Sequence, residues 1–139
     1  MPRINAANHE GHTVLIIAAY NGHLEIVKEL IQADAKINAA NHDGNTALII
    51  AAYKEHPEVV KELIKANAEV NAANHDGFTA LMWAVCKGQI PCVQLLLQAG
   101  ANREHKNRVG QTAHNRAQQL EDDDIREEIL RLLNEPITQ

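Results

Sequence analysis

The heptapeptide NAANHDG occupies residues 38–44 and again residues 71–77, and it stands with one change, NAANHEG, at residues 5–11. Successive copies are therefore 33 residues apart. A sequence that repeats with a period of this length predicts one small structural unit, copied along the chain and stacked on its neighbours. The Asp-Gly pair inside the heptapeptide predicts a tight turn with a positive φ angle.

The repeats in register are residues 4–36, 37–69 and 70–102, and a degenerate fourth unit follows at residues 103–139. Repeats one and two are identical at 23 of 33 positions, far more than chance allows. We therefore predict a single repeat domain over residues 1–139. Each unit of such a domain buries its apolar side only against its neighbours.

Two short helices are predicted in each unit. In repeat two, the Thr46 hydroxyl can cap a helix over ALIIAAY, and Pro57 can begin a second helix, where its missing N–H costs nothing. The apolar residues of PEVVKELIKA fall on one side of that second helix, with Val59 and Leu63 one turn apart. The two adjacent alanines of ALIIAAY are small enough for helices to pack closely.

The end of each second helix carries a specific signal. Asp34, Asn67 and Gly100 occupy corresponding positions in the three repeats. These residue types all tolerate the left-handed backbone conformation that often terminates a helix. We therefore predict a positive φ angle at all three positions.

Composition and charge exclude several function classes. The formal net charge is −5 and no block of Lys or Arg is present, so we expect no nucleic-acid partner. No apolar run approaches the ~18 residues that a membrane span needs, and no signal peptide is evident, so we expect a cytoplasmic protein without membrane contact. Cys86 and Cys92 lie six residues apart, which is neither a metal-site spacing nor a disulfide framework, so we predict free thiols.

Three longer stretches carry the full pattern of a repeat: INAANHEGHTVLIIAAYNGHLEIVKELIQADA, INAANHDGNTALIIAAYKEHPEVVKELIKANA and VNAANHDGFTALMWAVCKGQIPCVQLLLQAGA. Their Asn-Ala start, Gly-x-Thr and paired apolar residues, with the Ala-Ala of the first two stretches and the Gly-His of the first, resemble the ankyrin repeat family. The resemblance implies an all-α fold, an ankyrin-repeat α-solenoid of helix-turn-helix units joined by hairpin loops, the fingers. The heptapeptide is then the repeated finger.

Two departures from the family pattern affect the predicted contacts. Apolar residues replace the family's His of the first helix, so we expect apolar contact where the family usually has a polar network: Ile16, Ile49 and Met82. Asparagines replace the family's Asp in the finger: Asn8, Asn41 and Asn74.

The two ends of the chain differ in character. The fourth unit keeps Gly110 and Thr112, but it places polar residues where the other units carry apolar or small ones, and the acidic run EDDD precedes its last helix. It is therefore interpreted as a C-terminal cap with a polar outer face. Repeat one has no such cap, so either the chain is a cut-down piece of a longer protein or something covers this end.

We expect neither a metal nor a cofactor, and we expect no enzyme activity. His9, His42 and His75 form a ladder along the fingers, but stacked helical units are ~8–10 Å apart, too far for the side chains to converge on one zinc ion. His23 and His56 occupy the family's Gly-His position and are interpreted as structural. No phosphate-binding loop or Ser-His-Asp signature is present, and no acid is placed by a motif to orient a Cys86–His75 pair.

The resemblance also implies a binding surface, because the fingers and first helices of such stacks form a long concave face. We call this surface the concave face. Tyr20, Tyr53 and Phe78 place aromatic side chains there, although the two tyrosines could instead merely cover a helix end. The residues at the family's partner-facing positions are His9, Glu10, His12, Tyr20, Asn21, His42, Asp43, Asn45, Tyr53, Lys54, His75, Asp76, Phe78, Cys86 and Lys87.

The sequence thus favours non-catalytic binding of a protein partner through the concave face. Two alternatives stay open at this stage. One is an engineered or reconstructed scaffold without a native partner, because repeats one and two are so similar. The other is a structural protein that self-associates through repeat one.

Overall fold

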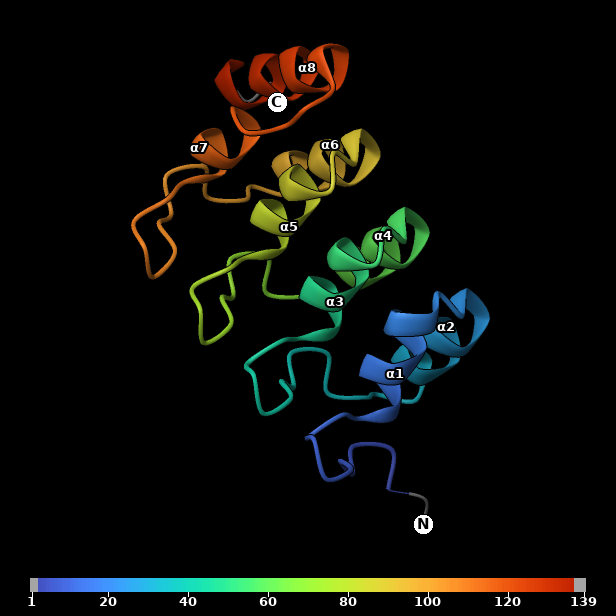
Figure 1. The fold of residues 1–139 in the computed structure, drawn as a ribbon. Coiled ribbons are helices and arrows are strands. Elements are labelled where there is room, and N and C mark those ends of the chain that lie inside the picture. The colour runs from blue at the N-terminus through green and yellow to red at the C-terminus, as the bar shows by residue number, and fades with distance from the viewer. Residues whose placement is uncertain (1–2, 137–139) are drawn as a thin grey trace.

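Eight helices in four pairs make up residues 3–136, the part of the chain that this computed structural model describes (Figure 1). The first helices of the units are α1 (Val14–Asn21), α3 (Ala47–Tyr53), α5 (Ala80–Cys86) and α7 (Ala113–Ala117). The second helices are α2 (Leu24–Gln32), α4 (Pro57–Lys65), α6 (Ile90–Gln98) and α8 (Asp123–Asn134). The pairs stack in chain order, which confirms the predicted all-helical repeat solenoid. The remaining residues of the predicted domain, 1–2 and 137–139, lie outside the described part.

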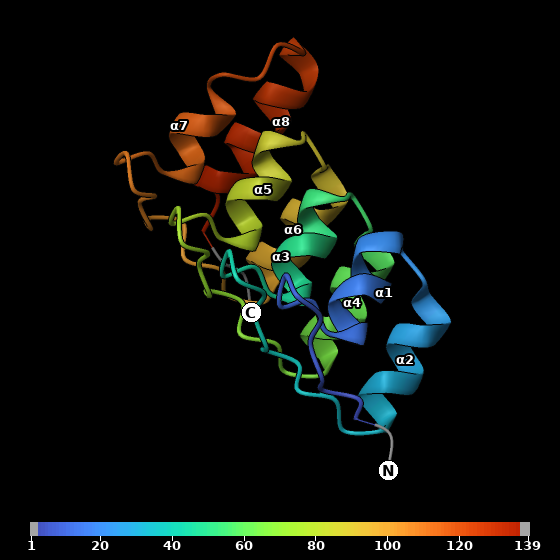
Figure 2. The same ribbon diagram turned by 60° about the horizontal axis from the view of Figure 1, so that its bottom comes forward.

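The fingers project from the side of the first helices, and the second helices lie on the opposite side of the stack (Figure 1). The turned view shows the fingers side by side along one edge of the molecule (Figure 2). Isolated antiparallel bridges between Ala40 and Thr46, and between Ala73 and Thr79, close the second and third fingers. The concave face is therefore made of consecutive, equivalent segments of the repeats.

A threonine is the N-cap residue of each first helix. In all four units its side-chain oxygen accepts a hydrogen bond, 3.2–3.3 Å long, from the backbone N–H three residues later. Such a cap typically contributes about 1 kcal/mol. The cap predicted at Thr46 is confirmed, and so is Pro57 as the first residue of α4.

Small and apolar residues of the first helices fill the centre of the stack. Ile16, Ile49 and Met82 are each at most 2 % exposed, so apolar contacts do replace a polar network at this position. Ala19 and Ala52 are completely buried. Because alanine has no side chain beyond Cβ, neighbouring first helices can approach closely along this line.

The predicted left-handed helix ends are confirmed. Asp34 has a φ angle of 63°, Asn67 of 66° and Gly100 of 87°. A further residue of this kind is Glu55, with a φ angle of 64°, at the end of α3 where the other repeats have Gly22 and Gly88. Glutamate rarely adopts this conformation, so Glu55 stores backbone strain that the glycines avoid.

The N-terminal end of the stack leaves large apolar side chains exposed, as predicted. Val14 is 46 % exposed, Ile17 41 % and Ile26 44 %. In repeat two the counterparts of Val14 and Ile26 are Ala47 and Val59, which are at most 1 % exposed. The difference arises because α3 and α4 lie against the preceding helix pair, whereas α1 and α2 begin the stack.

At the C-terminal end, α8 closes the stack with its apolar side. Ile129 is completely buried and Leu133 is nearly so, while the acids of the preceding run surround the start of the helix. Asp122 caps α8 through its carboxylate, and Asp123 and Asp124 lie in the first turn, where the helix dipole favours negative charge. The fourth unit thus combines a buried apolar side with an acidic helix start, and its role as a cap stays a prediction.

Candidate functional site

The turn of each finger is held by its asparagine. Asn8 Oδ1 accepts hydrogen bonds from the backbone N–H groups of Glu10 at 3.0 Å and His12 at 2.9 Å. The same pair of bonds forms at the equivalent positions of the other three fingers, at Asn41, Asn74 and Asn107. The turn needs only a side-chain oxygen as acceptor, which explains why asparagine can replace the family's aspartate here.

Backbone hydrogen bonds join each finger to the next. The N–H of His42 donates to the carbonyl oxygen of Glu10, and the N–H of His75 donates to that of Asp43, each at 3.0 Å. Arg108 donates in the same way to Asp76. The fingertips thus form a continuous hydrogen-bonded row rather than independent loops, which holds the concave face in a defined shape.

The repeated histidine packs on the glycine of the preceding finger. A Cβ atom built on Gly11 would lie only 2.7 Å from Cδ2 of His42, and one built on Gly44 would lie 2.8 Å from Cδ2 of His75. Both glycines also have positive φ angles. Each histidine therefore covers a position that only glycine can occupy, while part of its imidazole ring stays exposed to solvent.

Aromatic rings and cations alternate along the C-terminal ends of the first helices. Lys54 Nζ lies 4.6 Å from the ring centroid of Tyr20, and Lys87 Nζ lies 4.5 Å from that of Tyr53. In each pair the lysine comes from the repeat that follows the tyrosine. Such contacts contribute about 0.5–1 kcal/mol each at exposed sites. The two tyrosines keep 48 % and 36 % of their surface exposed.

The third repeat extends this line with further rings. Trp83 meets Tyr53 edge to face, with ring centroids 4.7 Å apart, and stacks on Phe78 at 4.6 Å. The guanidinium of Arg116 in the fourth unit lies over Phe78, 5.7 Å from the ring centroid. We name the complete set the aromatic–cation row: Tyr20, Tyr53, Lys54, Phe78, Trp83, Lys87 and Arg116.

The predicted partner-facing residues are all at least partly accessible. Those with intermediate exposure are His12, Asn45, Lys54, Phe78 and Cys86. The more exposed ones are His9, Glu10, Tyr20, Asn21, His42, Asp43, Tyr53, His75, Asp76 and Lys87. Asn45 also contributes to the structure, because its Oδ1 accepts a 2.9 Å hydrogen bond from Asn74 Nδ2 in the next finger.

Two members of the aromatic–cation row, Trp83 and Arg116, were not among the predicted partner-facing residues. Trp83 lies in the middle of α5, and Arg116 belongs to the fourth unit, which was interpreted as a polar-faced cap. Arg116 donates from Nε to Cys86 Sγ at 3.1 Å and from Nη1 to Gln111 Oε1 at 3.3 Å. The sequence did contain a signal for Arg116. It is charged, whereas the equivalent positions of the other units carry the apolar residues Ile17, Ile50 and Trp83.

The cysteines offer no sign of a nucleophilic site. Cys92 is completely buried in α6, and burial together with the negative charge of Glu55 raises the pKa of its thiol to about 11. Cys86 is half-buried and contacts Arg116, and neither cysteine is in a disulfide. Within residues 3–136, no cluster of three or more His, Cys, Asp or Glu side chains is arranged to hold a metal ion.

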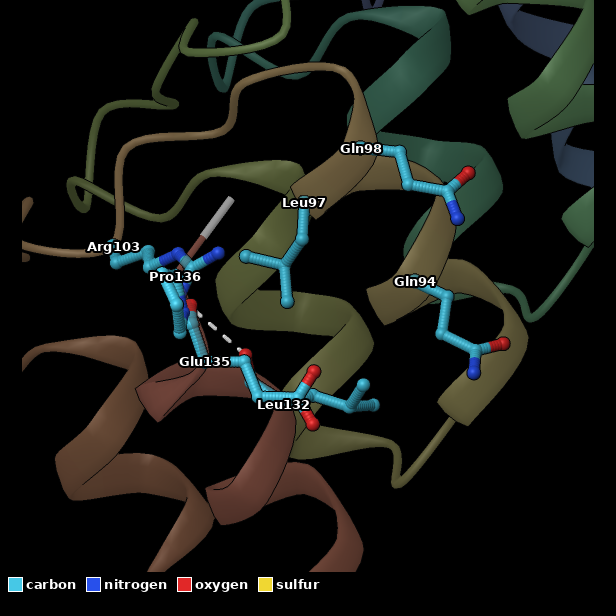
Figure 3. A pocket seen from close by; sticks show the side chains of 7 residues that line it. All are labelled: Gln94, Leu97, Gln98, Arg103, Leu132, Glu135 and Pro136. Atoms are coloured by element: carbon cyan, nitrogen blue, oxygen red, sulfur yellow. Dashed lines mark hydrogen bonds between the residues drawn. The ribbon is translucent and has the colours of Figure 1, made fainter. Parts of the chain in front are cut away.

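A shallow hollow between α6 and α8 is lined by Arg103 and the end of α8 (Figure 3). Arg103 Nη1 donates to the carbonyl oxygen of Leu133 at 2.9 Å and also to those of Leu132 and Glu135. The arginine thereby satisfies carbonyl groups that a helix end leaves unpaired. The hollow lies away from the aromatic–cation row. The side chain at its centre, Arg103, is already hydrogen-bonded to the end of α8.

None of the described helices is both long and apolar enough to cross a lipid bilayer.

Comparison with known proteins agrees with this repeat architecture. The family model described as ankyrin repeats (3 copies) matches residues 2–74, and the model described as ankyrin repeat matches residues 76–108. Together the two matches cover well over half of the chain, and α7 and α8 lie beyond them. No curated protein matches the chain.

Proposed function

Because the chain belongs to the ankyrin repeat family, whose members are generally non-catalytic protein–protein interaction modules, we propose that it binds a protein partner through its concave face. The observation that carries the proposal is the exposure of Tyr20 and Tyr53, at 48 % and 36 %, on neighbouring repeats. Tyrosines that combine a large ring with a polar end are frequent anchors of protein interfaces.

The rigidity of the concave face supports the proposal. Its fingers are joined by backbone hydrogen bonds, and its tyrosines are held beneath lysines of the next repeat. A surface that is already ordered loses little conformational entropy on binding, which favours affinity. The second helices offer no comparable row, since their exposed positions are mostly charged and form ion pairs within one helix, such as Lys28–Glu25 and Lys65–Glu62.

A display library of random 12-residue peptides, selected for binding to the immobilised chain, tests the proposal. The selected peptides are then measured against the Tyr20→Ala/Tyr53→Ala variant and against Glu29→Ala/Lys61→Ala, a matched control on the exposed side of the second helices. We expect the tyrosine variant to lose about tenfold or more in affinity, which corresponds to ~1.4 kcal/mol. The control variant should bind like the wild type.

Retention of full affinity by the tyrosine variant would show that the binding surface lies elsewhere. Both variants must first give the same thermal unfolding curve as the wild type, so that a loss of affinity is not a loss of fold. Because neither Tyr20 nor Tyr53 belongs to the buried apolar core, their truncation should leave that core intact.

A second candidate function is self-association through repeat one. Val14, Ile17 and Ile26 expose apolar surface at the start of the stack, whereas the counterparts of Val14 and Ile26 in repeat two, Ala47 and Val59, are buried. Burying a side chain of this size contributes about 1.5–3 kcal/mol. We propose that two copies bury these side chains against one another.

Sedimentation velocity over a concentration series tests self-association. The wild type should increase in mass with concentration, and Ile26→Lys should remain a monomer. Val109→Lys is the matched control, because Val109 is 78 % exposed but lies on the last finger, far from repeat one. A wild-type chain that stays monomeric at every concentration would contradict this candidate function.

A further inference from the structure

The aromatic–cation row carries positive charge without local neutralisation. Lys54 and Lys87 are held over tyrosine rings, and Arg116 is held over Phe78 with neutral hydrogen-bond partners. Across residues 3–136, the salt bridges involve other cations, and all of them lie on or next to second helices: Lys28, Lys65, Arg126 and Arg131. The cations of the row are thus available to a partner, although the whole chain is acidic with a net charge of −5.

The other border of the concave face has the opposite charge. Glu10, Asp43 and Asp76 stand at the fingertips, and their side chains form no salt bridge with any described residue. The fingertips precede the first helices, whereas Lys54 and Lys87 follow them. A seven-residue helix is about 10 Å long, which separates the acidic border from Lys54 and Lys87.

Apolar surface lies between the cations. Tyr20 and Tyr53 are exposed, and Trp83 and Phe78 are half-buried in a continuous aromatic cluster that starts at Tyr53. A ligand that reaches the lysines must therefore also lie against aromatic rings. A surface that combines positive charge with aromatic rings binds fewer kinds of ligand than a surface with only one of these features.

We propose that the protein partner presents an acidic segment in which carboxylate side chains alternate with apolar ones. The carboxylates pair with Lys54, Lys87 and Arg116, and the apolar side chains lie on the aromatic rings between them. This inference rests on the proposed function and specifies the chemistry of the partner. A nucleic acid is a poor fit, because its uniform negative charge would also face the acidic fingertips.

The spacing of the row predicts the spacing of the acids. Successive cations come from successive repeats, and neighbouring helix layers are about 8–10 Å apart. An extended peptide advances about 3.3 Å per residue, so three residues span one repeat. We therefore expect an acidic residue at about every third position of an extended segment that runs along the stack.

The random 12-residue library distinguishes this inference from the proposed function. Peptides selected on the wild type should be enriched in Asp and Glu relative to the unselected library, with apolar residues between the acids. Peptides selected on Lys54→Gln/Lys87→Gln should show no such enrichment. The control variant Lys28→Gln/Lys65→Gln removes two lysines from the second helices and should select the same acidic peptides as the wild type.

A selected acidic peptide and its Glu→Gln analogue are then compared by fluorescence anisotropy. The lysine variant should bind the acidic peptide about three- to tenfold more weakly than the wild type does, and the loss should shrink as salt concentration rises. The Gln analogue should bind both proteins equally.

Two outcomes would overturn the inference: selected peptides without acidic enrichment, or equal binding of the acidic peptide to the wild type and the lysine variant. In either case, binding that still depends on Tyr20 and Tyr53 would leave the proposed function standing. Binding that is independent of both tyrosines would instead remove the proposed function, and the inference with it.

Discussion

The imidazole Nε2 of His56 lies 3.1 Å from the carbonyl oxygen of Tyr20 in the preceding repeat. Gly22 makes this approach possible, because a Cβ atom at that position would come within 2.7 Å of the His56 ring. Gly22 also has a φ angle of 70°, which an L-amino acid adopts at a cost. The junction between repeats one and two thus depends on the absence of a side chain at Gly22.

We predict that Gly22→Ala destabilises the chain by about 2–3 kcal/mol, since it adds both backbone strain and a steric clash. Gly88→Ala is the matched comparison. Gly88 has a similar φ angle of 64°, but its added Cβ would meet only Ile125 Cγ2 at 3.3 Å, so we expect about 1–2 kcal/mol. Urea unfolding measures both. Equal losses in the two variants would show that the His56 contact contributes nothing.

Replacing the strained helix-end residues by glycine should stabilise the chain. Glu55→Gly should gain about 0.5–1 kcal/mol, because relief of the left-handed conformation exceeds the added flexibility of glycine. Asp34→Gly and Asn67→Gly should gain less, since aspartate and asparagine tolerate this conformation better. Thermal and urea unfolding should rank Glu55→Gly first. A loss of stability at all three positions would contradict the interpretation of these φ angles as strain.

Arg103 should be the most important side chain of the C-terminal cap. Arg103→Met removes a charged donor to three carbonyl groups at the end of α8 and should cost about 1–3 kcal/mol. Arg131→Met is the control, because Arg131 makes solvent-exposed ion pairs with Glu128 and Glu135, and such surface pairs contribute little to stability. Hydrogen exchange should accelerate in α8 of the first variant only. Similar behaviour of the two variants would argue against the capping role.

The finger turns should require an oxygen acceptor but not an amide. Asn41 is 7 % exposed, so Asn41→Ala leaves two partly buried N–H groups unpaired and should cost about 1–3 kcal/mol. Asn41→Asp keeps the acceptor and should remain close to the wild type. Asn8→Ala should cost less than Asn41→Ala, because water can reach the exposed first finger. Urea unfolding of the three variants checks this order, and a large loss for Asn41→Asp would reverse the argument.

Cys92 should make stability fall in alkaline solution. Its pKa in the folded chain is raised to about 11, from an ordinary value of 9.0. Above pH 9 the unfolded chain releases this proton more readily than the folded chain, so the unfolded state gains stability as pH rises toward 11. The difference in unfolding free energy between the wild type and Cys92→Val should therefore change in favour of the variant over pH 9–11. A constant difference across that range would contradict the raised pKa.

Much of the fold could be predicted because its signals are local. The Thr46 cap is a hydrogen bond with the residue three positions later. The positive φ angles of Asp34 and Asn67 arise at the end of the helix that directly precedes each residue. The 33-residue period then implies that each such unit is stacked on a similar one. Glu55 was the exception, since its residue type gave no reason to expect a left-handed conformation.

The candidate site was only partly predictable, because residue positions on a repeat do not specify contacts between repeats. The exposure of Tyr20 and Tyr53 followed from their place in the repeat, but the lysine over each ring did not. The packing of the repeated histidine on Gly11 and Gly44 was not foreseen. Such contacts depend on the distance and rotation between neighbouring units.

By itself, the sequence determined the repeating unit of this protein: its length, its two helices, its capped starts and its left-handed ends. These features depend on interactions between residues a few positions apart, and propensity and spacing describe such interactions well. Only the tertiary structure decided how the units meet, as in the pairing of His56 with Tyr20, 36 residues away, and of Arg103 with Leu133, 30 residues away. Those pairings require side chains from separate units to converge in space, which occurs only once the apolar helices have stacked and brought neighbouring repeats together.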